Sequence, residues 1–423
     1  MSKPATDARA AFETEVRGSR DRLVALCADL VRIDSQNPPG DTGPLAAAIE
    51  RLLADEPGIA TRRITAKAPA VNLLATIAGH AAGRRLVMNG HLDTFPAGDP
   101  ARWTVPPLGG AIVDGRIYGR GAADMKAGLA AAVLAGKLLA RHRTAWSGEL
   151  VLTLVGDEET GGLWGTQHLL KAVPEAAGDF MLSADAGSPQ VVRIGEKGQL
   201  WLEVTAAGKA NHGAHVHLGI NAIERLTAAL GRLTGLRAMA CPIPAGVLAV
   251  MDAAQQVSEA VSGIGEAHTL AHVTLNIGRI EGGSAVNIIP DAARALCDVR
   301  FPPGLAVADI VREIERLIGG APGIAHRVLS ATEATVTDPD HEGVRLAVAN
   351  AVSVVPGGAV VNMRVGFSDA RFYRLHGVPS IVYGPTPHNM GGPDENVTID
   401  DLFAVFYVHA MTAFDYLSRG RPA

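Results

Sequence analysis

The sequence predicts an α/β protein with a mixed, mostly parallel sheet flanked by helices, and a smaller α+β domain inserted into it. Strand-like apolar runs alternate with helical segments up to about Gly187, which is typical of a parallel sheet covered by helices. Near Arg193 the pattern changes to strands of alternating polarity. The length of 423 residues exceeds one ordinary core, so two domains are expected.

The first part of the catalytic domain is expected to cover residues 1–194. Its opening helix should end near Arg32 and carry Cys27 on its apolar face, as a small buried hydrophobe. DSQNPPG is rich in turn formers, and a helix should follow from Pro44 to about Leu53. The clearest helix covers Lys126 to His142, because strong helix formers fill it.

The inserted lid or dimerisation domain is expected to cover residues 195–335. QLWLEVTAAG, HVTLNIGRIEGG and ARALCDVRF have the composition and alternation of strands, whereas Asn221–Leu233 and VADIVREIERLIGG are predicted helices. Residues 336–423 should return to the first sheet with a strand at Ser380–Tyr383 and a terminal helix from Asp400.

Composition excludes several classes of protein. A net charge of −5 gives no electrostatic case for nucleic acid or an anionic membrane as partner. The three cysteines are scattered and form no C-x-x-C pair, so neither a disulfide framework nor a thiolate zinc site is indicated. The N-terminus has no continuous apolar region, and no segment is apolar for the length of a membrane span, so a cytoplasmic location is expected.

Residues of the kinds that bind metal ions follow four apolar runs. Ligands bind at the carboxyl ends of strands in open α/β sheets, so these side chains could converge on one crevice. They are His91 and Asp93 after LVMNG, Asp157, Glu158 and Glu159 after LVLTLV, Asp185 after DFMLSA, and His388 after SIVYG.

This set has the chemistry of a hydrolytic metal site. Such a site needs imidazole and carboxylate ligands and a nearby base that is not itself a ligand. Adjacent Glu158 and Glu159 would point in different directions, so one can bind metal while the other acts as base. Asp93, two residues after His91 on a strand, is placed to orient the imidazole. Asp124 joins the set, although an Asp before a helix is more often an N-cap. Carboxylate and imidazole without thiolate favour Zn, Mn or Co.

GHLDTFPAG, YGRGAADMKAG, VGDEETGG and GPTPHNMGGPDE resemble, in order and over nearly the whole chain, the motifs of one metallohydrolase family. That family, of metallopeptidase clan MH, contains aminoacylase, acetylornithine deacetylase, succinyl-diaminopimelate desuccinylase and carboxypeptidase G. The resemblance implies two metal ions bridged by Asp124, one also held by His91 and Asp185, the other by Glu159 and His388. It implies that Glu158 is the general base for the attacking water.

The resemblance extends into the inserted domain. In GKANHGAHVHLGINAI, it implies that His212 reaches the active site of the partner subunit in a homodimer formed through the lid. It also implies that Asn287 and Arg300 bind substrate carboxylate. Each has a structural alternative: His212 as one histidine of a surface loop, Asn287 as the cap of a turn before a proline, and Arg300 as a salt bridge. Val216 stands where relatives commonly have proline, and the acidic pair of HNMGGPDE lies farther from His388 than is usual.

The resemblance implies hydrolysis of an amide in a small, carboxylate-bearing N-acyl amino acid or peptide. An aminohydrolase that releases ammonia from a small aromatic amine, as nitroanthranilate deaminase does, would use the same activated water. A metal-binding protein of this fold without turnover is the non-enzymatic alternative, but it would not need Glu158 beside Glu159. A dinucleotide loop at GRGAAD and a serine nucleophile at GFSDA are weak, because neither completes its motif.

Overall fold

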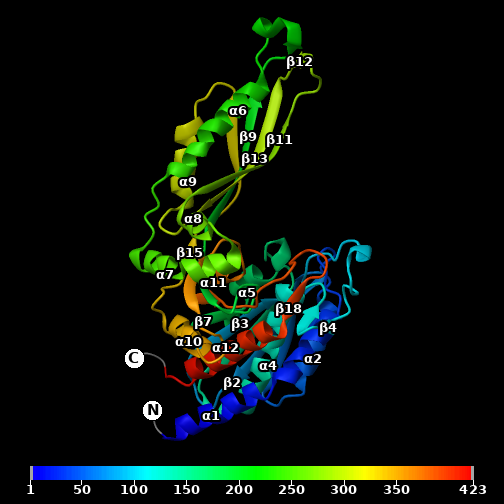
Figure 1. Cartoon of the computed structure of the whole chain (residues 1–423), viewed down its shortest axis with the longest axis vertical. Helices are drawn as coiled ribbons and strands as arrows, with labels where there is room; N and C mark the ends of the chain where they lie inside the picture. Colours follow the sequence, from blue (N-terminus) through cyan, green and yellow to red (C-terminus); the bar gives the residue numbers. More distant parts are fainter. Residues whose placement is uncertain (1–2, 421–423) are drawn as a thin grey trace.

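The computed structural model describes residues 3–420, and the chain forms an elongated molecule with a helix-covered body and a narrower lid (Figure 1). The first and last described helices, α1 (Lys3–Arg17) and α12 (Ile399–Leu417), both belong to the body (Figure 1). Among the described residues, no helix is both long and apolar enough to cross a membrane.

The body is built on a nine-stranded sheet. Its order is β1-β2-β6-β3-β7-β17-β8-β15, with β16 also paired to β8. The four middle strands β6, β3, β7 and β17 are parallel, whereas antiparallel pairs lie toward both edges. The strands are β1 (Ile59–Lys67), β2 (Ala70–Ala78), β3 (Arg85–His91), β6 (Glu149–Val155), β7 (Phe180–Ser183), β8 (Val191–Glu196), β15 (Thr335–Val336), β16 (Val360–Arg364) and β17 (Ser380–Val382).

Helices cover both faces of this sheet, so the side chains of its middle strands are buried on both sides. The larger core lies beneath α1 (Lys3–Arg17), α2 (Arg20–Val31), α3 (Gly43–Ala54), α4 (Ala127–Arg141), α10 (Glu342–Ala351) and α12 (Ile399–Leu417). On the other face, α5 (Thr166–Ala172) and α11 (Ala370–Leu375) cover a smaller core. A separate small sheet joins β4 (Ala111–Val113), β5 (Arg116–Tyr118) and β18 (Asn396–Thr398).

The lid has its own sheet and its own core. Its strand order is β11-β13-β9-β14, and α6 and α9 pack on one face over buried aliphatic side chains. These elements are β9 (Gly198–Ala207), α6 (Ala222–Leu233), β11 (Thr274–Gly282), β13 (Ala292–Phe301), α9 (Val307–Ile318) and β14 (Ile324–Thr332). At the far tip, β10 (Asn211–His212) pairs with β12 (Ile288–Ile289) (Figure 1).

The chain changes sheet twice. It leaves the body sheet with β8 at Glu196, enters the lid sheet at Gly198, and returns with β15 at Thr335. The α/β class with a mostly parallel central sheet is therefore confirmed, and we keep residues 195–335 as the proposed extent of the inserted domain.

Two helices within the inserted segment were not predicted. They are α7 (Ala245–Ser262) and α8 (Glu266–Ala271). Val247 and Met251 of α7 and Leu270 of α8 form a small core with Met363 of β16, so these helices pack on the body rather than on the lid sheet. The opening helix is also divided, at Gly18 and Ser19. Cys27 is fully buried as predicted, and burial raises the pKa of its thiol to about 12.

Candidate active site

Three neighbouring parallel strands deliver the candidate residues to one edge of the body sheet. His91 is the last residue of β3, Glu158 and Glu159 follow β6, and Asp185 follows β7. Since β6, β3 and β7 are adjacent and parallel, their carboxyl ends lie together. The side chains of His91 and Asp185 are buried there.

His91, Asp124 and Glu159 form a compact cluster. One nitrogen or oxygen of each lies within 4.8 Å of the others, as metal ligands do. His91 Nδ1 lies 2.8 Å from the backbone oxygen of Asp93, which leaves Nε2 facing Asp124 Oδ1 at 2.9 Å. The N-cap of α4 is Lys126, and Asp124 has extended backbone angles, so Asp124 does not cap this helix. Its carboxylate instead faces His91 and Glu159.

The cluster places several carboxylates close together in a buried position. Burial, together with the neighbouring carboxylates, raises the pKa of Glu158 to about 8 and that of Glu159 to about 9. Burial alone would lower the pKa of His91, but its hydrogen bond to Asp124 and the charges of both glutamates raise it instead. Glu159 Oε1 is buried without a hydrogen-bond partner among the described residues. A divalent ion here would satisfy that oxygen and offset the excess negative charge, so the donor set fits a metal.

Asp185 lies beside the cluster, whereas His388 has other neighbours. Asp185 Oδ2 accepts a hydrogen bond of 3.0 Å from Arg364 Nη1, and its carboxyl also interacts with Asp124. His388 lies in the loop between β17 and β18, half-buried, where its backbone pairs with Asn396. The described residues thus bring three of the five expected ligands within ligand distance of one another.

Asp93 is placed differently from the expectation. Its carboxylate lies 3.7 Å from His91 Nδ1, and the imidazole is held by the backbone oxygen instead. The carboxylate accepts the backbone N–H groups of Glu158 and Glu159, at 3.2 and 3.3 Å, and the Asn37 amide at 2.9 Å. Asp93 therefore fixes the turn that carries both glutamates.

Two buried charged pairs beside the cluster were missed by sequence reasoning. Arg371 Nη1 lies 3.7 Å from Glu158 Oε1. Glu395 forms a buried ion pair with Arg120 and accepts the backbone N–H of Asp124 at 3.2 Å. The signals available in the sequence were the charged residues themselves, in GFSDARF for Arg371 and in the acidic pair of HNMGGPDE for Glu395.

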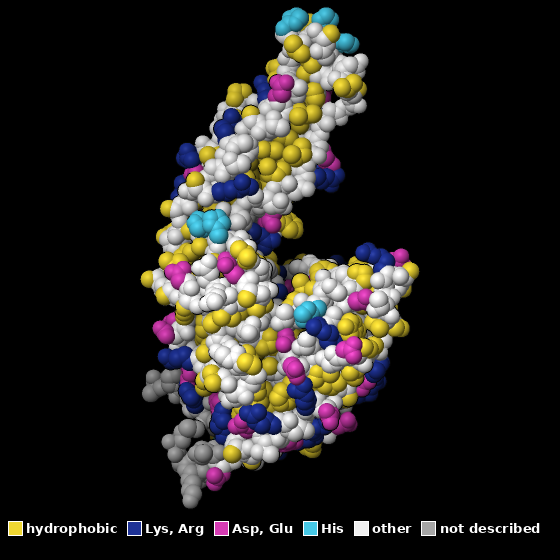
Figure 2. Space-filling view, in the orientation of Figure 1, with side chains coloured by type: hydrophobic (Ala, Val, Ile, Leu, Met, Phe, Trp, Pro, Cys, Tyr) yellow, Lys and Arg dark blue, Asp and Glu magenta, His cyan; other side chains and the backbone are white. Residues whose placement is uncertain are grey.

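The three lid residues do not belong to the cluster, and only two of them lie together. His212 and Asn287 are exposed at the tip, where Gly213 donates its N–H to the Asn287 backbone oxygen at 2.6 Å. Figure 2 shows histidine side chains gathered at this tip. Arg300 lies at the opposite end of the lid sheet. Its Nε donates to Asp298 at 2.8 Å and its guanidinium lies 4.5 Å from the Phe367 ring centre.

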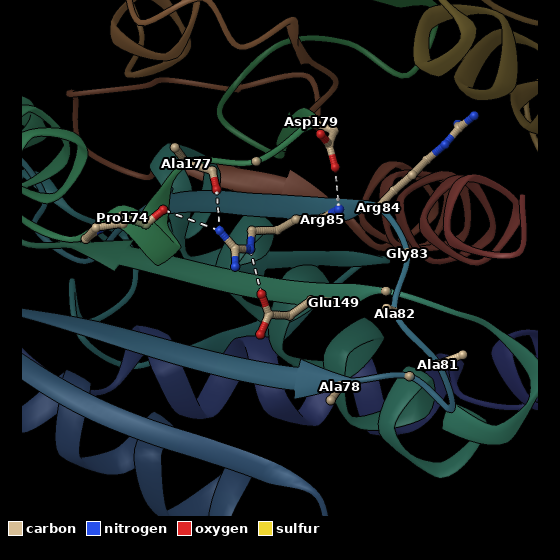
Figure 3. A pocket seen from close by; sticks show the side chains of 13 residues that line it. Ala78, Ala81, Ala82, Gly83, Arg84, Arg85, Glu149, Pro174, Ala177 and Asp179 are labelled. Carbon is tan, nitrogen blue, oxygen red and sulfur yellow. Dashed lines mark hydrogen bonds and ion pairs between the residues drawn. The ribbon is translucent and has the colours of Figure 1, made fainter. Parts of the chain in front are cut away.

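The opposite edge of the body sheet has a hollow of a different kind (Figure 3). It lies at the start of β3 and β6, and Arg85 in its wall donates to Glu149 at 2.5 Å and to the backbone oxygens of Pro174 and Ala177 at 3.3 Å. This arginine is already paired, and no group of metal ligands lies there among the described residues. The candidate metal ligands are therefore found at the carboxyl ends of the parallel strands, not at this hollow.

Known proteins share both the sequence pattern and the fold. The profile of peptidase family M20/M25/M40 matches residues 87–415. Succinyl-diaminopimelate desuccinylase of Rhodospirillum centenum is 31% identical, with 94% of this chain and 98% of that protein aligned.

Two solved structures share the fold. The M20 metallo-carboxypeptidase of Sulfolobus solfataricus has a TM-score of 0.74 at 18% identity, over 93% of this chain and 99% of that one. A dinuclear metal-binding M20 peptidase of Bacillus subtilis has a TM-score of 0.68 at 15% identity, over 95% and 99%.

The profile spans most of the chain, and the desuccinylase matches almost end to end. The cluster that fits a divalent metal lies inside the matched region, as do both glutamates. The chain belongs to peptidase family M20/M25/M40 and is a metal-dependent hydrolase of amide carbon–nitrogen bonds.

Proposed function

We propose that the enzyme binds two divalent ions, of Zn, Mn or Co, and removes the acyl group from a small, carboxylate-bearing N-acyl amino acid or peptide. The observation that carries this proposal is the cluster of His91, Asp124 and Glu159, with its excess of buried carboxylate and an unpartnered Glu159 oxygen. Asp124 would bridge the ions, Asp185 would complete one site with His91, and His388 would complete the other with Glu159.

Bound ions of this kind lower the pKa of water and polarise the carbonyl of the amide. Glu158 would take the proton of the attacking water and pass it to the departing amine. Two features support this role: Asp93 holds the backbone of Glu158, and burial already raises the pKa of its carboxyl to about 8. Arg371, 3.7 Å away, would limit that rise and keep the side chain in place.

The lid would supply the remaining contacts through a homodimer. The outer edges of its strands β11 and β14 pair with no other strand in the described part of the chain, and its tip exposes Val216, Leu218 and Val286. Exposed strand edges and clustered apolar side chains are usually covered by a partner. In a twofold dimer, His212 and Asn287 of one subunit would reach the metal cluster of the other, and Arg300 would bind a substrate carboxylate from its own subunit.

The matched relatives named as desuccinylases make N-succinyl amino acids the first substrates to test. A location in the cytoplasm would suit such a substrate. We expect hydrolysis of one or more members of a panel of N-acetyl and N-succinyl amino acids and dipeptides, with release of a free amine.

Metal removal is the test of the site. A chelator should abolish turnover, and Mn, Co or Zn should restore it. Ammonia should be measured in parallel with 2-aminobenzoate derivatives as substrates. Full activity in metal-free protein would contradict the metal site, and ammonia release without cleavage of any amide would favour the aminohydrolase reaction instead.

A further inference from the structure

A second cavity, of about 290 Å³, adjoins the proposed metal site. Gly187, just after Asp185, forms one wall, and Thr386, two residues before His388, forms another. Ser262 at the end of α7 closes a third side. The cavity therefore lies between two loops that carry proposed metal ligands and a helix that belongs to the inserted segment.

Two arginines, Arg193 and Arg364, line this cavity, which we call the arginine pocket. Arg193 is built into the wall. Its Nη1 donates to the Met363 backbone oxygen at 2.6 Å, its Nη2 donates to Ser262 Oγ at 2.9 Å, and Glu266 pairs with it at 3.0 Å. Its charge is thus balanced by Glu266, and its donors fix the position of the Ser262 hydroxyl.

The charge of Arg364 is balanced by other groups. Its single hydrogen bond among the described residues goes from Nη1 to Asp185 Oδ2, at 3.0 Å. Nε and Nη2 donate to none of the described residues, and the side chain keeps 17% of its surface exposed. Besides Asp185, the nearby carboxylates of Glu196 and Asp124 stabilise its charge, so Arg364 offers the cavity a charged group with two free N–H donors.

The two guanidinium groups are close enough to affect each other. Burial lowers the pKa of Arg193, and the charge of Arg364 lowers it further, against the opposing effect of Glu266. Placing like charges side by side in a buried wall costs free energy unless an anion joins them. Arginine forks bind carboxylates with two parallel hydrogen bonds, which suits the free donors of Arg364.

We propose that the arginine pocket binds a carboxylate of the substrate, with Arg364 as the charged donor and the Ser262 hydroxyl as a second donor. This inference rests on the proposed function and narrows its substrate class to amides that bear a short carboxylate arm. The carboxylate can belong to the acyl group, as in a succinyl amide, or to the amino acid that is released. Phe367 and Arg300 lie outside this pocket, so the contact is additional to the one proposed for Arg300.

Three substrates built on one amino acid separate these sources: the N-acetyl form, the N-succinyl form, and the N-succinyl form with its α-carboxylate converted to an amide. In metal-loaded Arg364→Gln, kcat/KM should fall about 10- to 100-fold, mainly through KM, for substrates with the recognised carboxylate. For substrates that lack this carboxylate, kcat/KM should change less than about threefold. If kcat/KM falls for both succinyl substrates, the pocket binds the carboxylate of the acyl group. If it falls for both substrates that keep the α-carboxylate, the pocket binds the carboxylate of the released amino acid.

Ser262→Asp provides a second variant that does not touch Asp185. The new carboxylate would repel the substrate's own, so it should weaken the same substrates as Arg364→Gln. Exposed Arg345→Gln is the matched control for loss of an arginine and should leave all three substrates unchanged. Equal losses on all three substrates in Arg364→Gln, with or without loss of bound metal, would overturn the proposal.

Binding can be measured without turnover. Calorimetry of succinate with metal-loaded protein should show affinity at least tenfold weaker in Arg364→Gln than in the unaltered protein. Equal or undetectable binding in both proteins would contradict the pocket. If the unaltered enzyme cleaves none of the three amides, the proposed substrate class fails, while the calorimetric comparison still decides whether the pocket binds carboxylate.

Discussion

The histidines of the body and of the lid tip have opposite surroundings. His91 is 2% exposed and is held on both ring nitrogens, by the Asp93 backbone oxygen and by Asp124. His212 is exposed, and its Nδ1 accepts only the N–H of Ala214, at 3.1 Å. The body therefore contains a cluster assembled within one chain, whereas the tip exposes side chains whose proposed function requires a second subunit.

Local architecture explains this difference. His91 and both glutamates follow parallel strands buried on both faces, and Asp93 ties the two segments together. The tip depends on the two-residue ladder of β10 and β12 and a short 3₁₀ turn. A well-packed scaffold can hold a catalytic group within fractions of an ångström, whereas an exposed turn gains that order on association.

The largest effect should come from the body cluster. Glu158→Gln should lower kcat about 10²- to 10⁴-fold because the amide cannot accept the proton of the attacking water. Metal content should be retained, since the variant keeps Glu159 in the cluster. Both quantities can be measured on the same preparation, with kcat from amine release and metal from elemental analysis.

Glu159→Gln is the matched control, because it makes the same chemical change one residue away. It should weaken metal binding, and added metal should restore part of its turnover. If Glu158→Gln loses metal while Glu159→Gln retains it, the roles of the two glutamates must be exchanged.

The next largest effect tests whether the lid tip of one subunit completes the active site of the other. His212→Ala and Glu158→Gln homodimers should each be nearly inactive. When the two proteins are unfolded and refolded together, mixed dimers should contain one site with both residues intact. Random mixing makes half of the dimers mixed, so about a quarter of the sites should be active.

His217→Ala mixed with Glu158→Gln is the control for nonspecific effects of altering the tip. Its rate should follow simple dilution, because His217→Ala retains activity alone. A protein that is monomeric and fully active at assay concentration, or His212→Ala mixtures without rescue, would rule out the contribution across the interface.

Sequence reasoning was most successful where a residue's role follows from its place at a strand end. The α/β class, the helices near residues 44–53 and 126–142, and the burial of Cys27 were predicted, because periodicity and composition determine them locally. The gathering of His91, Asp124 and Glu159 followed from motifs and the strand-end rule together. The assignment of their roles stays a prediction.

Other features depend on long-range pairing that a single sequence does not display. Helix α7 lies in the inserted segment but packs on β16, over a hundred positions away along the chain. Glu395 supports the backbone of Asp124 from a loop near the C-terminus, and Arg364 reaches Asp185 across strands. Each residue has an ordinary surface interpretation until the fold brings its partner beside it.

A third histidine gives the smallest predicted effect and extends the comparison from activity to stability. His409 of α12 is buried, with Nε2 2.7 Å from the Tyr383 backbone oxygen and Nδ1 lacking a partner among the described residues. Burial lowers its pKa to about 4, despite the opposing hydrogen bond to Tyr383. In the unfolded chain this imidazole should have a pKa near 6.5, so it binds a proton there as the pH falls. In the folded protein it binds that proton only near pH 4. Stability from this residue is therefore present above pH 6.5 and is lost as the pH falls toward 4.

His409→Gln keeps an N–H donor for Tyr383 but does not titrate in this range. Its free energy of unfolding, measured by denaturant titration, should rise relative to the unaltered protein by about 2 kcal/mol between pH 7.5 and pH 5, as linkage requires. His217→Gln removes an exposed histidine of the tip, so its difference from the unaltered protein should be nearly the same at both pH values. If both variants show the same pH response, burial of the imidazole does not distinguish the body from the tip, and the proposed neutral state of His409 is wrong.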